Sequence, residues 1–197
     1  MKDETNRGTS SGSVRRRTVV QGTAWAAPAI AVTGVAPKVS ASPTPERGLN
    51  GWVELSRTCN FNTNRFRVDG RGTYDDRGLW TFTVQTDEPT TATIIFWFDR
   101  STLQFTNASG SGWSNLTRNS TFDSQKPGFY AYVTNYTGAW NYVDAPGTTN
   151  DRWEATSDPY WYAENAGCSG QICGHARRTV RYTDGTSVSF DRGPVCV

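Results

Sequence analysis

Acidic and aromatic residues are interleaved between positions 151 and 164, and their types are those best suited to chemistry on a ligand. Two carboxylates that face each other across a cleft can hydrolyse a glycosidic bond, and rings beside carboxylates can hold a sugar by stacking and hydrogen bonding. The alternative is that the rings fill a core while the acids stay solvated at its edge. The acids are Asp151, Glu154, Asp158 and Glu164, and the rings are Trp153, Tyr160, Trp161 and Tyr162.

The best candidate for a recognition surface in this region is the run from Asp158 to Tyr162. Pro159 stiffens the entry to the run, and strand alternation sends Trp161 to the opposite side from Tyr160 and Tyr162. One of these sides faces the core and the other faces water, so we expect at least one large ring to be exposed. The alternative is that the loop between Cys168 and Cys173 folds over the rings as a lid. The candidate binding surface consists of Trp153, Tyr160, Trp161 and Tyr162.

The rest of the sequence contains no coherent catalytic constellation. His175 is the only histidine, so a serine or cysteine triad would have to use it, and its position beside Arg177 and Arg178 favours an exposed loop instead. The Gly-Ser-Gly at 110–112 lacks the strand–turn–helix context of a nucleophile elbow. A turn accounts for the paired acids Asp75-Asp76 without a function. The sequence therefore names no catalytic residue and favours a protein that is not an enzyme.

Four cysteines lie beyond residue 41 and predict two disulfides in an exported chain. Cys168 and Cys173 enclose a short loop that can close on itself, which would leave Cys59 to pair with Cys196. We favour this pairing, and the two other connectivities stay open. A zinc site built from Cys168, Cys173, His175 and Cys196 is the alternative. Oxidised cysteines argue against it, so we predict no metal site and no cofactor.

Beyond residue 48 the chain shows the period-two alternation of β-strands rather than a helical period. The run from Ala92 to Phe98 is apolar on both faces, which predicts a strand at the centre of a sheet. Asp184-Gly185 predicts a tight hairpin turn. Alternating apolar faces are carried by Phe66 and Val68; by Trp80, Phe82 and Val84; by Val180 and Tyr182; and by Val188 and Phe190. Further strands are predicted at 50–57, 103–106, 128–136, 138–143 and 152–157.

These patterns predict an all-β fold, an antiparallel two-sheet β-sandwich of immunoglobulin-like or jelly-roll-like type. It would contain about ten short strands and two disulfides. We expect a single domain over residues 49–197, preceded by a short extended linker at 42–48 that is rich in proline and polar residues.

The first 41 residues differ from the rest in charge. They hold six basic and two acidic residues, a net charge of +4, whereas the remaining 14 basic and 16 acidic residues give −2. The predicted domain therefore has no basic character that would suit nucleic acid. Polar residues up to Arg17, an uncharged stretch from Val19 to Val35 and the small residues Val39-Ser40-Ala41 form the three parts of a secretory signal.

Within this leader, Arg16-Arg17-Thr18-Val19-Val20-Gln21 resembles the twin-arginine (Tat) motif of export signals. The weakly hydrophobic core and Lys38 near the cleavage site are also similar to that class, as found in secreted actinobacterial proteins. The resemblance covers the leader alone and implies export of a folded protein by the twin-arginine route.

Together these features predict a secreted or cell-envelope-associated protein without a catalytic role, an interaction module built on a β-sandwich. A secreted carbohydrate-binding domain is the alternative, followed by a carboxylate-dependent hydrolase. We expect the partner to be a protein or a glycan at the cell surface. We expect no nucleic-acid partner. We also expect no stable membrane anchor after cleavage, because Ser42 rather than cysteine follows the cleavage site and the C-terminus carries no sorting sequence.

Cleavage is expected after Ala41, because Val39 and Ala41 occupy the two positions at which a signal peptidase needs small residues. Mass spectrometry of the secreted protein should find Ser42 at its N-terminus. Replacing the pair by Arg16→Lys and Arg17→Lys should hold the precursor inside the cell. Undiminished export of this double variant would leave only the general secretory route.

Overall fold

The computed structural model describes residues 47–60, 63–71, 78–108, 111–147 and 150–197. The predicted signal peptide at 1–41, the first part of the linker, and Asp75 and Asp76 lie outside these ranges. The described residues form an all-β fold of antiparallel strands, as the sequence predicted. Within them, no helix has the length and apolar character required to cross a membrane.

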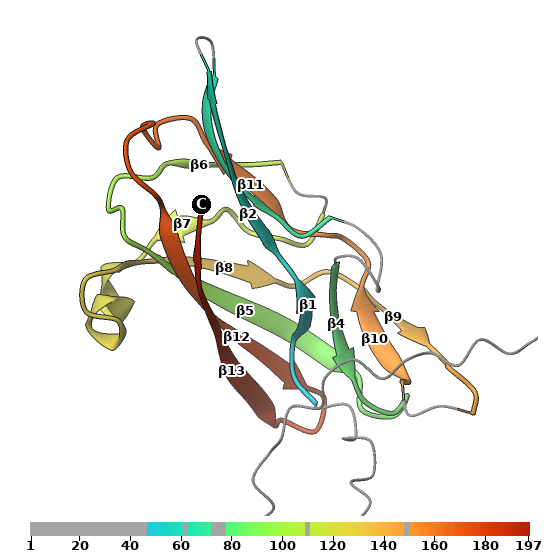
Figure 1. Ribbon diagram of the computed structural model, residues 1–197. Coiled ribbons are helices and arrows are strands. Elements are labelled where there is room, and N and C mark those ends of the chain that lie inside the picture. Colours follow the sequence, from blue (N-terminus) through green and yellow to red (C-terminus); the bar gives the residue numbers. More distant parts are fainter. Residues whose placement is uncertain (1–46, 61–62, 72–77, 109–110, 148–149) are drawn as a thin grey trace, which may run out of the picture. The chain divides into compact units, whose positions relative to one another are not determined.

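The largest sheet has five antiparallel strands in the order β13-β12-β5-β8-β7, and Figure 1 shows β5 and β12 next to each other at its centre. The predicted central strand is confirmed, since β5 is flanked on both sides and its last five residues are buried. The predicted Asp184-Gly185 turn joins β12 to β13, with Gly185 at a φ of +83°. The strands are β5 (Pro89–Phe98), β7 (Thr117–Arg118), β8 (Tyr130–Tyr136), β12 (Cys173–Tyr182) and β13 (Ser187–Cys196).

Two four-stranded sheets lie end to end and together form what we call the split layer. One has the order β1-β4-β10-β9 and the other β2-β3-β11-β6. In Figure 1, β1 runs directly into β2. The strands β3 and β4, and likewise β10 and β11, also follow each other along the chain, so the first three strands of the two sheets correspond. Their strands are β1 (Asn50–Trp52), β2 (Glu54–Asn60), β3 (Thr63–Asp69), β4 (Gly78–Phe82), β6 (Phe105–Asn107), β9 (Trp140–Val143), β10 (Arg152–Ala155) and β11 (Tyr160–Ala163).

The main core lies between the split layer and the five-stranded sheet and is built largely from aromatic rings. The ring of Phe66 on β3 meets that of Phe98 on β5 edge to face, with centroids 5.2 Å apart. Phe96 on β5 similarly faces Trp161 on β11 at 6.4 Å. Because edge-to-face pairs of this kind hold two sheets in a fixed relation, few aliphatic residues are needed to close the sandwich.

The outer face of the five-stranded sheet carries a second, smaller cluster around Trp97. The short 3-10 helix η1 (Ser120–Gln125) supports it, since the indole N–H of Trp97 donates to the carbonyl of Phe122 at 3.0 Å. This cover explains why β5 is apolar on both faces.

The prediction for β4 is wrong about which side faces the core. Leu79 and Thr81 are buried, whereas Trp80 is only half-buried and Val84, beyond the strand, is 59% exposed. Thr81 can face the core because its hydroxyl shares a 2.5 Å hydrogen bond with the hydroxyl of Tyr182. A satisfied hydroxyl removes the cost of burying a polar side chain.

The favoured disulfide pairing is also wrong, because the structure joins Cys59 to Cys168 and Cys173 to Cys196. The strand register explains the second bond: Cys173 lies directly opposite Cys196 in the β12–β13 ladder, with Cα atoms 4.0 Å apart. The first bond ties the end of β2 to the loop before β12, and Arg57 supports it by donating to the carbonyls of Gly167 and Gly170.

The two disulfides should differ in their contribution to stability, because they close loops with separations of 109 and 23 residues. Chain-entropy arguments assign about 5 kcal/mol to the long loop and about 3 kcal/mol to the short one. Urea unfolding of Cys59→Ser/Cys168→Ser should therefore show the larger loss relative to Cys173→Ser/Cys196→Ser. Peptide mapping without reduction provides the control, and recovery of a Cys168–Cys173 link would contradict this connectivity.

Candidate functional site

Two of the four residues predicted to form a binding surface lie in the core. Trp161 is fully buried, and its indole N–H donates to the carbonyl of Ser114 at 3.2 Å. Trp153 is 9% exposed, and its indole donates to the carbonyl of Val84 at 3.3 Å. Both rings serve the packing between the layers, so neither is available to stack on a ligand.

Tyr160 and Tyr162 lie on the outer face of β11, as the alternation predicted, and both are half-buried. Their ring centroids are 6.2 Å apart. The guanidinium carbon of Arg71 lies 3.7 Å from the centroid of Tyr160, and that of Arg65 lies 4.3 Å from the centroid of Tyr162. Cation–π contacts therefore already cover part of both rings.

The acidic residues of this region are engaged in contacts of their own rather than assembled as a catalytic pair. Glu154 accepts from Arg152 at 2.6 Å, and Glu164 pairs with Arg65. Asp151 accepts from the backbone N–H of Ala145 at 2.9 Å. These contacts account for three of the four carboxylates in structural terms.

His175 lies in β12 rather than in an exposed loop, so that prediction is wrong. It is half-buried against the ring of Phe129, with centroids 4.8 Å apart. Burial first, and then the charge of Lys126, lowers the pKa of its imidazole. The zinc alternative is overturned as well, because all four cysteines are in disulfides. Across the described ranges, no other group of three or more potential ligands could hold a metal ion.

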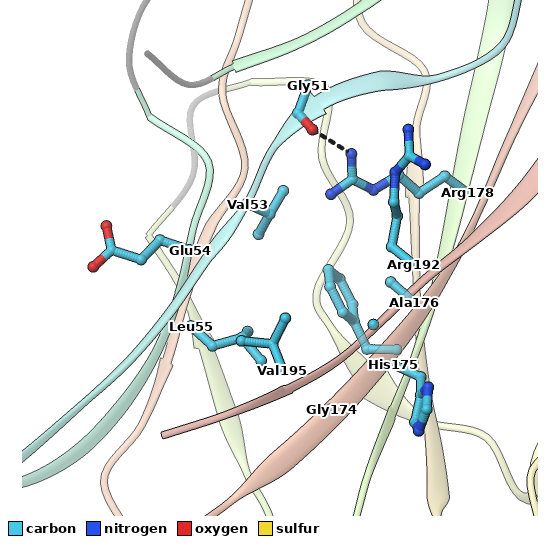
Figure 2. A pocket seen from close by; sticks show the side chains of 12 residues that line it. Gly51, Val53, Glu54, Leu55, Gly174, His175, Ala176, Arg178, Arg192 and Val195 are labelled. Carbon is cyan, nitrogen blue, oxygen red and sulfur yellow. Dashed lines mark hydrogen bonds between the residues drawn. The ribbon is translucent and has the colours of Figure 1, made fainter. Parts of the chain in front are cut away.

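The structure adds a feature that the sequence analysis missed, a cavity of about 340 Å³. It lies where β1 passes into β2, over the inner face of β12 and beside β13 (Figure 2). The ring of His175 points away from it. Gly51 permits the close approach of β1 to β4, since a Cβ atom there would lie 2.0 Å from the carbonyl oxygen of Gly78. The apolar part of the lining comprises Val53, Leu55, Phe96, Ala176 and Val195.

A buried arginine forms the polar end of this cavity. Arg178 is 5% exposed, and its Nη1 donates to the carbonyl of Gly51 at 2.7 Å. Among the residues that the structure describes, none accepts a hydrogen bond from its Nε. Burial, reinforced by the charge of Arg192, lowers the pKa of Arg178 to about 10 from 12.5. A lowered pKa means that burial disfavours the charged form of this side chain.

The alternation of side chains along the strand could have predicted that Arg178 faces the interior. Val180 and Tyr182 were correctly placed on one face of a strand, and continuing that alternation backward assigns Arg178 and Ala176 to the same inner face. The predicted alternation named only Val180 and Tyr182, and a fully buried charged residue is rare.

Comparisons with known proteins do not assign the chain to a family. No family model matches the chain, and a search of curated proteins finds no match.

Replacing Arg178 by methionine should leave the free energy of unfolding unchanged or raise it by about 1 kcal/mol, because an apolar side chain of similar length removes a buried charge that lacks a carboxylate partner. The pKa of Arg178 is lower in the folded state than in the unfolded state, so its positive charge lowers the free energy of unfolding at every pH below about 10. Urea unfolding should therefore show the same difference in the free energy of unfolding between Arg178→Met and the wild-type protein at every pH between about 6 and 8.

Arg152→Met is the matched control, because it breaks the ion pair with Glu154 and should lower stability. A clear loss of stability in Arg178→Met would show instead that Arg178 has a structural role.

Proposed function

We propose that this protein is an exported, non-catalytic binding module whose ligand occupies the cavity beside Arg178. The observation that carries the proposal is an apolar cavity that ends at a buried arginine, Arg178, for which the described residues supply no carboxylate partner. Ligand sites commonly combine a mostly apolar lining with a few placed polar groups, in volumes of about 300–1,000 Å³. The cavity has both properties.

Two features support export. The leader resembles twin-arginine signals, and the two disulfides are compatible with an oxidising compartment outside the cytosol. Both disulfides lie at or just before the first residue of β12, on which the cavity is built, and would help to keep the binding site in shape there. A role in the cell envelope agrees with this location.

Recognition of a sugar or protein at the outer face of β11 is the second candidate function. It is favoured by the two half-buried rings of Tyr160 and Tyr162 and the arginines above them. It ranks below the cavity because the rings are already partly covered, and because Trp153 and Trp161 do not contribute to that face.

The proposal predicts that the neutral fluorescent probe N-phenyl-1-naphthylamine binds the wild-type protein with a gain in emission. Val195→Trp should abolish this gain, because Val195 is 50% exposed and lines the cavity, so a larger ring there would fill it. Val84→Trp places the same ring at another exposed valine outside the cavity and should leave the emission unchanged.

The absence of any emission gain in the wild-type protein, together with no binding of the octanoyl probes described below, would reject the cavity as a ligand site. Loss of binding in Tyr162→Ala, with Val195→Trp still binding, would move the site to the outer face of β11.

A further inference from the structure

We infer that the cavity takes an organic anion, a carboxylate attached to a compact apolar body, with the carboxylate held between Arg178 and Arg192. This inference rests on the binding role proposed above and names its ligand class. It follows from the lining, which is cationic at one end and apolar over the rest.

Arg178 is positioned to receive a carboxylate. It occupies an inner-face position of β12 between Ala176 and Val180, where the neighbouring side chains are apolar and buried. In the described part of the chain no carboxylate pairs with it, and its Nε has no acceptor. A buried guanidinium without a carboxylate partner among the described residues suits an acceptor that brings its own negative charge.

Arg177, the neighbour on the opposite face of β12, shows how this fold treats an arginine that is structural. Its Nε donates to Asp191 at 2.8 Å and its Nη2 donates to the same carboxylate at 3.2 Å. The two consecutive arginines thus differ in the one feature that matters for ligand binding, since only Arg177 has a carboxylate partner within the described residues.

Arg192 of β13 supplies a second cation at the same end of the cavity. It is exposed and lies over the ring of Phe190, with its guanidinium carbon 4.4 Å from the centroid. Figure 2 shows its guanidinium beside that of Arg178, and its charge adds to the burial that lowers the pKa of Arg178. An anion between the two groups would turn this repulsion into two attractions.

The remaining lining limits the ligand to a molecule with one anionic group. Glu54 borders the cavity, but its carboxylate points away from the arginines in Figure 2. The side chains of Val53, Leu55 and Val195 offer only apolar contact below them. A polyanion would leave charges against these side chains, whereas an alkyl or aryl carboxylate would match both ends.

Isothermal titration with octanoate and octanamide, in a buffer free of phosphate and carboxylates, tests the inference directly. The two probes have the same chain and differ in the charge of the headgroup. Wild-type protein should bind octanoate at least about tenfold more tightly, because a charge-assisted hydrogen bond to a buried arginine is stronger than a neutral one. Arg178→Met should bind both probes with similar affinity.

Arg181→Met is the matched control, since Arg181 is an exposed arginine of the same strand that does not line the cavity, and it should keep the preference. If Arg178→Met does not fold, Arg192→Met replaces a surface residue and should reduce the preference several-fold.

Equal affinities for octanoate and octanamide in the wild-type protein would overturn the inference, and so would a preference that survives in folded Arg178→Met. Binding of N-phenyl-1-naphthylamine without binding of either octanoyl probe would also overturn it, while the proposed binding role would stand. Failure of all three probes would reject the binding role itself.

Discussion

The rest of the structure depends on one constraint: the apolar inner face of β5 and β12 must be covered by a second layer. These central strands carry Phe96, Phe98 and Val180, which are almost fully buried, and a sheet face of this kind must be covered by another layer. The split layer provides the cover with the rings of Phe66 and Trp161. Cover is continuous within each of its two sheets and weaker where one passes into the other.

The cavity is a consequence of this junction. The residues from Gly51 to Leu55 straddle the end of β1 and the beginning of β2, and the part of β12 below them carries glycine at 174 and alanine at 176 instead of large side chains. Gly174 is itself closely packed, since a Cβ atom there would lie 2.9 Å from the ring of Phe98, so glycine is needed for this contact. The cavity lies between β12, which has the small residue Ala176 here, and the junction of β1 and β2 in the split layer. Arg178 closes it at one end.

The local sequence pattern was sufficient to predict the strands but not how they meet. Alternation located β3, β5 and β12 and separated Trp161 from Tyr160 and Tyr162. It failed at β4, where the buried hydroxyl of Thr81 has a partner 101 positions away in Tyr182. It failed for the cysteines because their pairing depends on the β12–β13 register, which places Cys173 opposite Cys196. Both failures concern contacts between distant segments, which no local period contains.

The consecutive arginines of β12 show why residue composition alone could not predict the cavity and its buried arginine. Arg177 and Arg178 are identical in type, yet strand geometry sends them to opposite faces. On the outer face Arg177 meets Asp191 and is half-exposed, so its charge is both paired and hydrated. On the inner face Arg178 is buried, and burial lowers the pKa of its guanidinium. A sequence selected only for packing would place an apolar residue there, as it does at Ala176 and Val180. A buried arginine at this position, where packing alone would favour an apolar residue, agrees with the proposed anion site.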